Sequence, residues 1–210
     1  MTLIYAVAAI AIAYLLGSLP IGVFAARLVK GVEIREVGSG RPGTTNAYRA
    51  AGPWGAAITS AGDILKGIIA VWLARFLMAL APLNGWSPWI MTLAGVAAVV
   101  GHNYSIFLGF KGGAGTVTTI GVLSAMNPWV AVAVTVVGVA AIAISRMASI
   151  GSITVAVSMS FALVISAALR ATPWAYVPFG VAAGALTILA LRPNIHRILT
   201  RQERELKTNY

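Results

Sequence analysis

The chain has 210 residues, of which 59% are hydrophobic and 10% are charged, and its formal net charge is +10. This composition excludes an ordinary soluble domain, because it is more apolar than the core of a domain of this size requires. The cations lie in short segments beside apolar runs, which argues against a nucleic-acid-binding protein. Because the chain has no cysteine, disulfides, thiol nucleophiles and cysteine-ligated metals are excluded as well.

The apolar residues come in blocks that predict an all-α membrane protein with seven transmembrane helices. A helix needs about 20 residues to cross about 30 Å of hydrocarbon, and the blocks lack the alternation of an outer-membrane barrel. The predicted spans cover residues 3–28, 54–80, 89–100, 115–125, 129–144, 150–169 and 174–191. No linker or repeat divides the chain, so residues 1–210 are expected to form one transmembrane domain.

The first span is expected to be retained, because no basic residue precedes it and its apolar run continues beyond Pro20. Gly17, Ser18 and Pro20 can kink this helix, either for packing or to free backbone groups for a cavity. A polar loop is predicted from Lys30 to Pro53, and it contains the glycine-rich stretch 38–46.

The second span carries charges at membrane depth, which are costly unless they are neutralised. Asp63 and Lys66 lie three residues apart on one helical face, so they either pair with each other or face a polar cavity. A short uncharged turn is expected at residues 82–88.

A second glycine-rich stretch, residues 101–116, lies between two apolar runs. Glycine lets backbone N–H groups approach a ligand, so Lys111 with the amides of Gly112 to Gly115 predicts a cradle for phosphate. The short span 115–125 fits a half-helix whose amino end points at this loop.

The distribution of cations predicts the orientation in the membrane. Twelve of the fifteen fall on one side if there are seven spans, while Arg75 and Arg170 lie near the other side and Lys66 lies within a span. The positive-inside rule therefore places the amino terminus outside and the carboxy terminus in the cytoplasm. Both glycine-rich loops and the basic tail then share the cytoplasmic face.

Three groups of polar residues on that face fit phosphate, which arginine can bind through two hydrogen bonds. Each alone could be a turn with a lipid-facing charge, but together they indicate a phosphate site. The groups are Arg41 and Arg49 with Ser39, Thr44, Thr45 and Asn46; Lys111 with Gly112, Gly113 and Gly115; and Asn194 with Arg192 and Arg197.

The two histidines do not predict a catalytic pair or a metal site. Neither His102 nor His196 has an acid four residues on, and the five acids are scattered, so no metal is expected. His196 fits a helix surface, and His102 is either a loop hydrogen-bonding residue or part of the phosphate site.

In combination, the motifs resemble the bacterial acyl-phosphate-dependent glycerol-3-phosphate acyltransferases. The resemblance covers nearly the whole chain in order, and its most specific part is GHNYSIFLGFKGG at 101–113. The other motifs are Gly17-Ser18-x-Pro20-x-Gly22, GSGRPGTTN at 38–46 followed by Arg49, Asp63-x-x-Lys66-Gly67, and Asn194-Ile195-x-Arg197 with Glu203.

This resemblance implies a multi-pass enzyme of the bacterial inner membrane that uses no cofactor. It would transfer an acyl group from acyl phosphate to the sn-1 hydroxyl of glycerol 3-phosphate, giving lysophosphatidic acid and phosphate. Its expected partners are the two substrates and membrane lipid, not nucleic acid. A divergent paralogue that binds or transports phosphorylated lipid precursors is the alternative, and a purely structural protein with basic loops is a third interpretation.

The resemblance also implies roles for individual residues. Ser39, Arg49, Lys111 and Asn194 would be catalytic, and Glu203 would be a structural acid. The residues expected to bind substrate are Arg41, Thr45, Asn46, Asp63, Lys66, His102, Gly112, Gly113, Gly115 and Arg197. No position supplies an obvious general base, so the glycerol hydroxyl is expected to attack directly and to pass its proton to a phosphate oxygen of a substrate.

Four positions depart from the family pattern. Arg41 replaces an asparagine and Thr44 an alanine, while Ala114 stands where the family has a second lysine and Leu191 where it has a histidine. One hypothesis is that Arg41 restores the positive charge that Ala114 removes.

Overall fold

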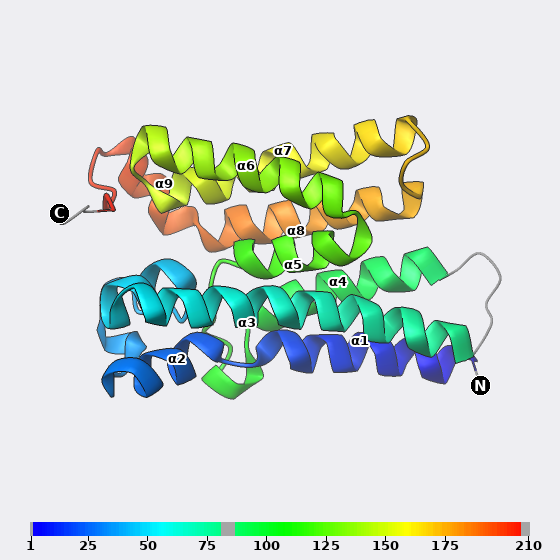
Figure 1. The fold of residues 1–210 in the computed structure, drawn as a ribbon, viewed down its shortest axis with the longest axis horizontal. Helices are drawn as coiled ribbons and strands as arrows, with labels where there is room; N and C mark the ends of the chain where they lie inside the picture. The colour runs from blue at the N-terminus through cyan, green and yellow to red at the C-terminus, as the bar shows by residue number, and fades with distance from the viewer. Residues whose placement is uncertain (1, 81–86, 207–210) are drawn as a thin grey trace.

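The computed structural model describes residues 2–80 and 87–206, and within them it is a bundle of α-helices with three short 3₁₀ helices and no strand (Figure 1). The helices are α1 (Thr2–Ser18), α2 (Ile21–Lys30), α3 (Thr44–Leu80), α4 (Ser87–Asn103), α5 (Thr116–Met126), α6 (Pro128–Ser145), α7 (Ala148–Ala168), α8 (Val177–Ala190) and α9 (Arg192–Leu199). The 3₁₀ helices are η1 (Ile34–Glu36), η2 (Ile106–Leu108) and η3 (Trp174–Tyr176).

Each predicted span contains a helix, and the predicted break in the first span is confirmed. Proline has no N–H to continue the helical ladder, and the chain separates into α1 and α2 at Leu19 and Pro20. The expected turn at residues 82–88 lies largely outside the described residues.

The prediction of a polar loop as far as Pro53 was wrong at its carboxyl end. Residues from Thr44 onward are already helical, and α3 is kinked at Gly52, which has a φ of 69°. Pro53 can begin the next helical segment because the first turn of a helix needs no N–H donor from it. The glycine–proline pair therefore separates a short helical segment, residues 44–51, from the long segment that begins at Pro53, close to the predicted start of the second span.

Four described helical segments are long and apolar enough to cross a membrane. A fifth crossing follows if α8 with η3 and α9, which meet at a bend of 62°, count as one span. Helix α5 has 11 residues and is about 16 Å long, which is only half of the hydrocarbon thickness. Length and composition thus support a multi-pass all-α protein with four or five crossings, fewer than the seven predicted.

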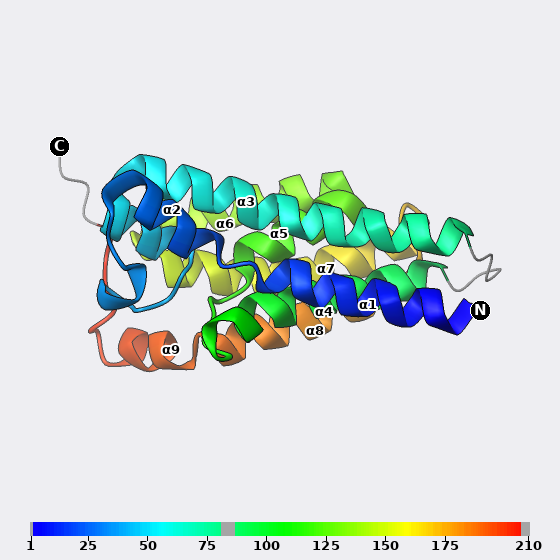
Figure 2. The same ribbon diagram turned by 90° about the horizontal axis from the view of Figure 1, so that it is seen from below.

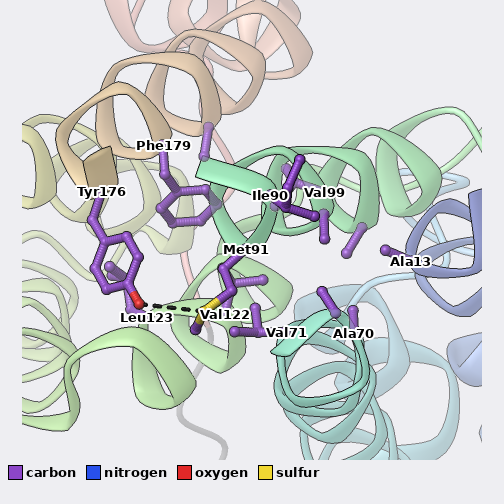
Figure 3. Close-up of a cluster of buried hydrophobic side chains, with 14 of the residues drawn as sticks. Ala13, Ala70, Val71, Ile90, Met91, Val99, Val122, Leu123, Tyr176 and Phe179 are labelled. Carbon is purple, nitrogen blue, oxygen red and sulfur yellow. Dashed lines mark hydrogen bonds between the residues drawn. The ribbon is translucent and has the colours of Figure 1, made fainter. Parts of the chain in front are cut away.

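The bundle has two groups of helices, α1 to α4 and α6 to α9, as Figure 1 shows. The apolar core lies between these two groups, and α5 is central to it. Helix α1 packs along α4, α6 packs along α7, and α5 contacts α3, α4 and α6 (Figures 1 and 2). Figure 3 shows side chains from several of these helices meeting in one apolar cluster, where the Tyr176 hydroxyl donates a hydrogen bond to Met91 Sδ at 3.5 Å. Burial of this cluster holds the two groups together.

Two glycines let α3 and α5 touch backbone to backbone. A Cβ atom at Gly121 would lie 2.2 Å from the carbonyl oxygen of Ile64, and one at Gly67 would lie 2.5 Å from that of Thr118. No larger residue fits at either position without moving a helix. This contact fixes the place of α5 relative to α3.

The helices bring the polar segments together at one end of the bundle. Helix α2, the beginning of α3 and helix α9 lie at that end, whereas α1 begins at the opposite end (Figure 1). Segments far apart in the sequence are therefore neighbours there.

Candidate functional site

A cavity at this polar end has about 730 Å³ of empty space, including the open region at its mouth. Its walls come from the segment before α3 and from α3, α4, α5, α7, α9 and the residues that follow α9. The lining residues are Ser39, Arg41, Gly43, Thr44, Thr45, Asn46, Arg49, Asp63, His102, Gly113, Ala114, Gly115, Thr116, Val117, Ala148, Ser149, Ser152, Leu191, Asn194, Glu203 and Arg204.

Four helices present their amino ends to this cavity. Thr44 begins α3, Thr116 begins α5, Ala148 begins α7 and Asn194 lies in the first turn of α9, and all four residues line the cavity. The first N–H groups of a helix have no partner within it and carry partial positive charge, which favours a bound anion. The fold thus directs several positive helix ends toward one space.

At the carboxyl ends of two helices near the cavity, carbonyl oxygens accept hydrogen bonds from other parts of the protein. The carbonyl oxygens of His102 and Asn103 at the end of α4 accept hydrogen bonds from Gly113 N and Gly112 N, each at 3.0 Å. The carbonyl oxygen of Ala190 at the end of α8 accepts one from Arg41 Nη2. These donors screen the negative ends of α4 and α8 from the cavity.

This arrangement corrects one prediction about the second glycine-rich stretch. The amides of Gly112 and Gly113 are not free to bind phosphate, because they close the end of α4. A Cβ atom at Gly112 would lie 1.9 Å from the His102 carbonyl oxygen, so glycine is required there by the close approach. The amides that remain at the cavity are those around Gly115, where α5 begins.

The first glycine-rich loop is folded by Asn46. This side chain is 2% exposed, and its Nδ2 donates hydrogen bonds of 2.9 Å to the carbonyl oxygens of Ile34 and Val37. Its Oδ1 accepts a hydrogen bond of 3.0 Å from the backbone N–H of Ser39. Asn46 lines the cavity, but its polar atoms hold the loop that places Ser39 there.

Both predicted arginines of the first loop line the cavity. Burial, together with the nearby charge of Arg197, lowers the pKa of the Arg41 guanidinium from its ordinary value. A bound anion would relieve this unfavourable environment. Arg41 therefore has two functions available to it, closing the end of α8 and attracting a phosphate.

Asp63, Lys66 and His102 form a buried cluster between α3 and α4. Lys66 Nζ lies 2.8 Å from Asp63 Oδ1 and 2.8 Å from His102 Nδ1, and His102 Nδ1 lies 3.5 Å from Asp63 Oδ1. Lys66 Nζ also donates a hydrogen bond of 3.3 Å to the carbonyl oxygen of Leu19, at the break between α1 and α2. Asp63 and Lys66 thus neutralise each other, and Asp63 and His102 line the cavity at the same time.

The residues after α9 form a strap, defined here as residues 200–206, that folds back over the cavity. Glu203 Oε1 accepts a hydrogen bond from Asn194 Nδ2 at 2.7 Å, and Glu203 Oε2 accepts one from Arg197 Nε at 2.9 Å. Burial acts to raise the pKa of Glu203, but these hydrogen bonds outweigh it and lower the pKa below its ordinary value. The carboxylate therefore stays charged and leaves the amide oxygen of Asn194 as an acceptor at the cavity.

The structure brings most of the predicted site residues to the cavity, but not all of them. Lys111 and Gly112 are not part of its wall, and Lys111 is exposed on the loop before α5. Lys66 and Arg197 contact it only through Asp63 and Glu203. Sequence reasoning missed Ser149, Ser152 and Arg204, although a serine pair three residues apart at the start of a helix was a visible signal.

The described residues contain no group of three or more His, Cys, Asp or Glu side chains that could hold a metal ion. The polar groups of the cavity wall are instead hydroxyls, amides, guanidinium groups, the imidazole of His102 and two carboxylates. Such a set fits an anionic organic ligand.

Comparison with known proteins gives consistent matches along the chain. Residues 7–201 match the family model described as glycerol-3-phosphate acyltransferase. A glycerol-3-phosphate acyltransferase of Trichormus variabilis is 41% identical over 206 residues, covering 93% of this chain and 89% of the relative. One of Syntrophomonas wolfei is 35% identical over 199 residues, covering 95% and 96%.

Two solved structures are similar in fold and sequence. Both are described as PlsY, an integral membrane glycerol 3-phosphate acyltransferase, one in its glycerol 3-phosphate form and one in its lysophosphatidic acid form. Their TM-scores are 0.83 and 0.82, their identities are 36% and 35%, and each match covers 97% of this chain and 96% of the other.

Proposed function

Since this chain belongs to the glycerol-3-phosphate acyltransferase family and is an acyltransferase acting on glycerol 3-phosphate, we propose that its acyl donor is an acyl phosphate and that the cavity is the active site. The products are then lysophosphatidic acid and inorganic phosphate. A divergent paralogue that only binds or transports lipid precursors is not favoured, because the relatives are named as enzymes across nearly their full length.

The observation that carries this proposal is the convergence of four helix amino ends and several arginine side chains on one cavity. Both proposed substrates and one product carry a phosphate group. Each group is a strong acceptor of charge-assisted hydrogen bonds from arginine and from backbone amides. The lipid-facing helices around the cavity suit an acyl tail that stays in the bilayer.

The reaction needs no covalent enzyme intermediate. The sn-1 oxygen of glycerol 3-phosphate attacks the acyl carbonyl carbon, a new ester C–O bond forms, and the C–O bond to the phosphate leaving group breaks. The hydroxyl proton passes to an oxygen of a substrate phosphate, and it leaves on the released phosphate or on lysophosphatidic acid, according to which phosphate accepts it. The protein contributes by holding the two substrates in contact and by stabilising the charge that develops during attack.

We assign the individual roles as follows. The hydroxyl of Ser39 and the guanidinium of Arg49 bind phosphate oxygens, and the amide oxygen of Asn194 accepts a hydrogen bond from the attacking hydroxyl. Arg41, Thr45 and the amides from Gly115 onward complete the anion site, with Asp63 and His102 in its wall. Asn46, Gly112, Gly113, Lys66 and Arg197 act by holding these groups, and Lys111 attracts anionic substrates at the surface.

The membrane arrangement that we propose has seven crossings within one domain of residues 1–210. The start of α1 and helix α9 lie at opposite ends of the bundle, as an odd number of crossings requires. Most cations lie at the α9 end, which supports an outer amino terminus and a cytoplasmic cavity in a bacterial inner membrane. Helices α3 and α5 would count among the seven crossings. Neighbouring helices surround the polar part of α3 and the short helix α5.

The test is an assay of purified protein in lipid with acyl phosphate and glycerol 3-phosphate. Phosphate release is expected to require both substrates, and Ser39→Ala should reduce kcat/KM about 100-fold, as the loss of a donor to developing charge does. Ser158→Ala is the matched control, because its hydroxyl bonds only to the carbonyl oxygen of Val155 in its own helix. Phosphate release without glycerol 3-phosphate, or a trapped acyl-enzyme, would contradict the proposal.

A further inference from the structure

The strap brings to the cavity an arginine that the sequence analysis did not single out. Arg204 lines the cavity together with Arg49, so two guanidinium groups border the same space. Within residues 2–80 and 87–206, neither guanidinium forms a hydrogen bond or an ion pair. Two like charges thus face one space without a protein partner.

Both carboxylates in the cavity wall already have hydrogen-bonded or ionic partners. Glu203 is held by Asn194 and by Arg197, which lies outside the wall. Asp63 is neutralised by Lys66. The excess positive charge of Arg49 and Arg204 therefore remains for a ligand, and guanidinium groups bind phosphate oxygens through paired hydrogen bonds.

The strap is fixed on both sides of Arg204. Gln202 N donates a hydrogen bond of 2.7 Å to the carbonyl oxygen of Arg197, and Leu206 N donates one of 2.8 Å to that of Arg146 in the turn between α6 and α7. With Glu203 also anchored, hydrogen bonds hold the chain on both sides of Arg204. This is a built part of the cavity wall, unlike a loose basic tail.

We propose that Arg204 and Arg49 form one phosphate-binding subsite, and that Arg204 is a substrate-binding residue of this enzyme. The inference rests on the proposed function, in which two phosphate groups share the cavity during each turnover. Each group carries up to about two negative charges, so two separate cationic sets reduce their mutual repulsion. The phosphate belongs either to glycerol 3-phosphate or to the acyl phosphate, and kinetics separate these sources.

The experiment measures KM for each substrate, with the other saturating, in wild type, Arg204→Gln and Arg204→Lys. Arg204→Gln is expected to raise one KM about tenfold or more, the effect of losing a charge-assisted pair of hydrogen bonds, while kcat changes about twofold or less. Arg204→Lys should recover part of the loss, because it restores the charge without the planar fork. The substrate whose KM rises identifies the phosphate.

Arg201→Gln is the matched control, because Arg201 lies in the same strap, carries the same charge and does not line the cavity. Both of its KM values should stay at the wild-type level, and thermal unfolding of all variants should coincide. Unchanged KM values in Arg204→Gln, or an equal rise in Arg201→Gln, would overturn the inference while leaving the proposed function standing. An inactive wild-type enzyme would instead overturn the proposed function.

Discussion

At the scale of residues, the site divides into side chains that face the cavity and side chains that hold them. Ser39 and Asn194 face the cavity. Each is held in place by a partner whose own polar side-chain atoms are already hydrogen-bonded. Asn46 orients the loop of Ser39, and Glu203 orients Asn194. Positioning residues of this kind are expected to affect both activity and stability.

Replacing Asn46 by alanine tests this division. The change would leave the carbonyl oxygens of Ile34 and Val37 without their donor, so we expect a loss of about 2–3 kcal/mol of stability together with a loss of activity. Thermal unfolding in detergent and kcat/KM measure the two effects. Thr45→Ala is the control, since Thr45 lines the same cavity and should affect activity alone. An Asn46→Ala enzyme that is inactive but as stable as wild type would show that Asn46 binds substrate directly.

The hypothesis that Arg41 restores a missing charge is also a matter of single residues. Ala114 and Leu191 do line the cavity with apolar side chains, and Arg41 lies in the same wall. Its bond to Ala190, however, gives it a second function in closing α8. Loss of activity on replacing Arg41 would therefore not distinguish compensation from a displaced helix end, and Arg204 is another source of charge at the same cavity.

At the scale of elements, the direction in which a helix points decides what it contributes to the cavity more than its composition does. Helix α5 is short, so its amino end lies within the bundle and not at the surface, and its backbone contact with α3 fixes that position. The glycine-rich stretch before it closes α4 and lets α5 begin at Gly115. The glycine-rich stretch thus donates hydrogen bonds to the last carbonyl oxygens of α4 and leaves the first amides of α5 exposed to the cavity.

A substitution at Gly121 tests the importance of this contact. In Gly121→Ala, the new methyl group would lie 2.2 Å from the Ile64 carbonyl oxygen, so the helices must separate. We expect a loss of about 1–3 kcal/mol of stability and a reduced kcat, because the amino end of α5 moves. Thermal unfolding and turnover should be compared with Gly180→Ala, where the nearest atoms to the new methyl group would be Leu163 Cδ1 at 3.0 Å and Ser160 Cα at 3.2 Å, so a much smaller shift is enough. Equal behaviour of the two variants would contradict this explanation.

The sequence predicted these elements well where local signals decide and poorly where distant contacts decide. The apolar runs located the helices that contain the seven predicted spans, and Pro20 marked the break between α1 and α2. Helix α9 lies in the segment expected to be a basic tail and was missed. The helical segment from Thr44 was missed because Gly52 and Pro53 have the local pattern of a helix start. The bonds of Gly112 and Gly113 to the end of α4 depend on how the chain folds back, which no spacing of residues reveals.

At the scale of the whole molecule, the proposed orientation can be tested directly because the chain has no cysteine. Single cysteines at exposed Leu3 and Arg201 should react differently with a membrane-impermeant maleimide on intact spheroplasts. Leu3→Cys is expected to be labelled, and Arg201→Cys should be labelled only after lysis, because Leu3 belongs to the start of α1 and Arg201 follows α9, which lie at opposite ends of the bundle (Figure 1). Lysed membranes serve as the control for reactivity, and the reverse pattern would invert the proposed topology.

The strap also has a consequence for biosynthesis. Residues 200–206 follow all the helices of the described part of the chain, so this part of the cavity wall is made after the others. A chain made only as far as α9 lacks Glu203, and with it the partner that orients Asn194. Catalysis should therefore begin only after the strap has been made and has folded back to α9.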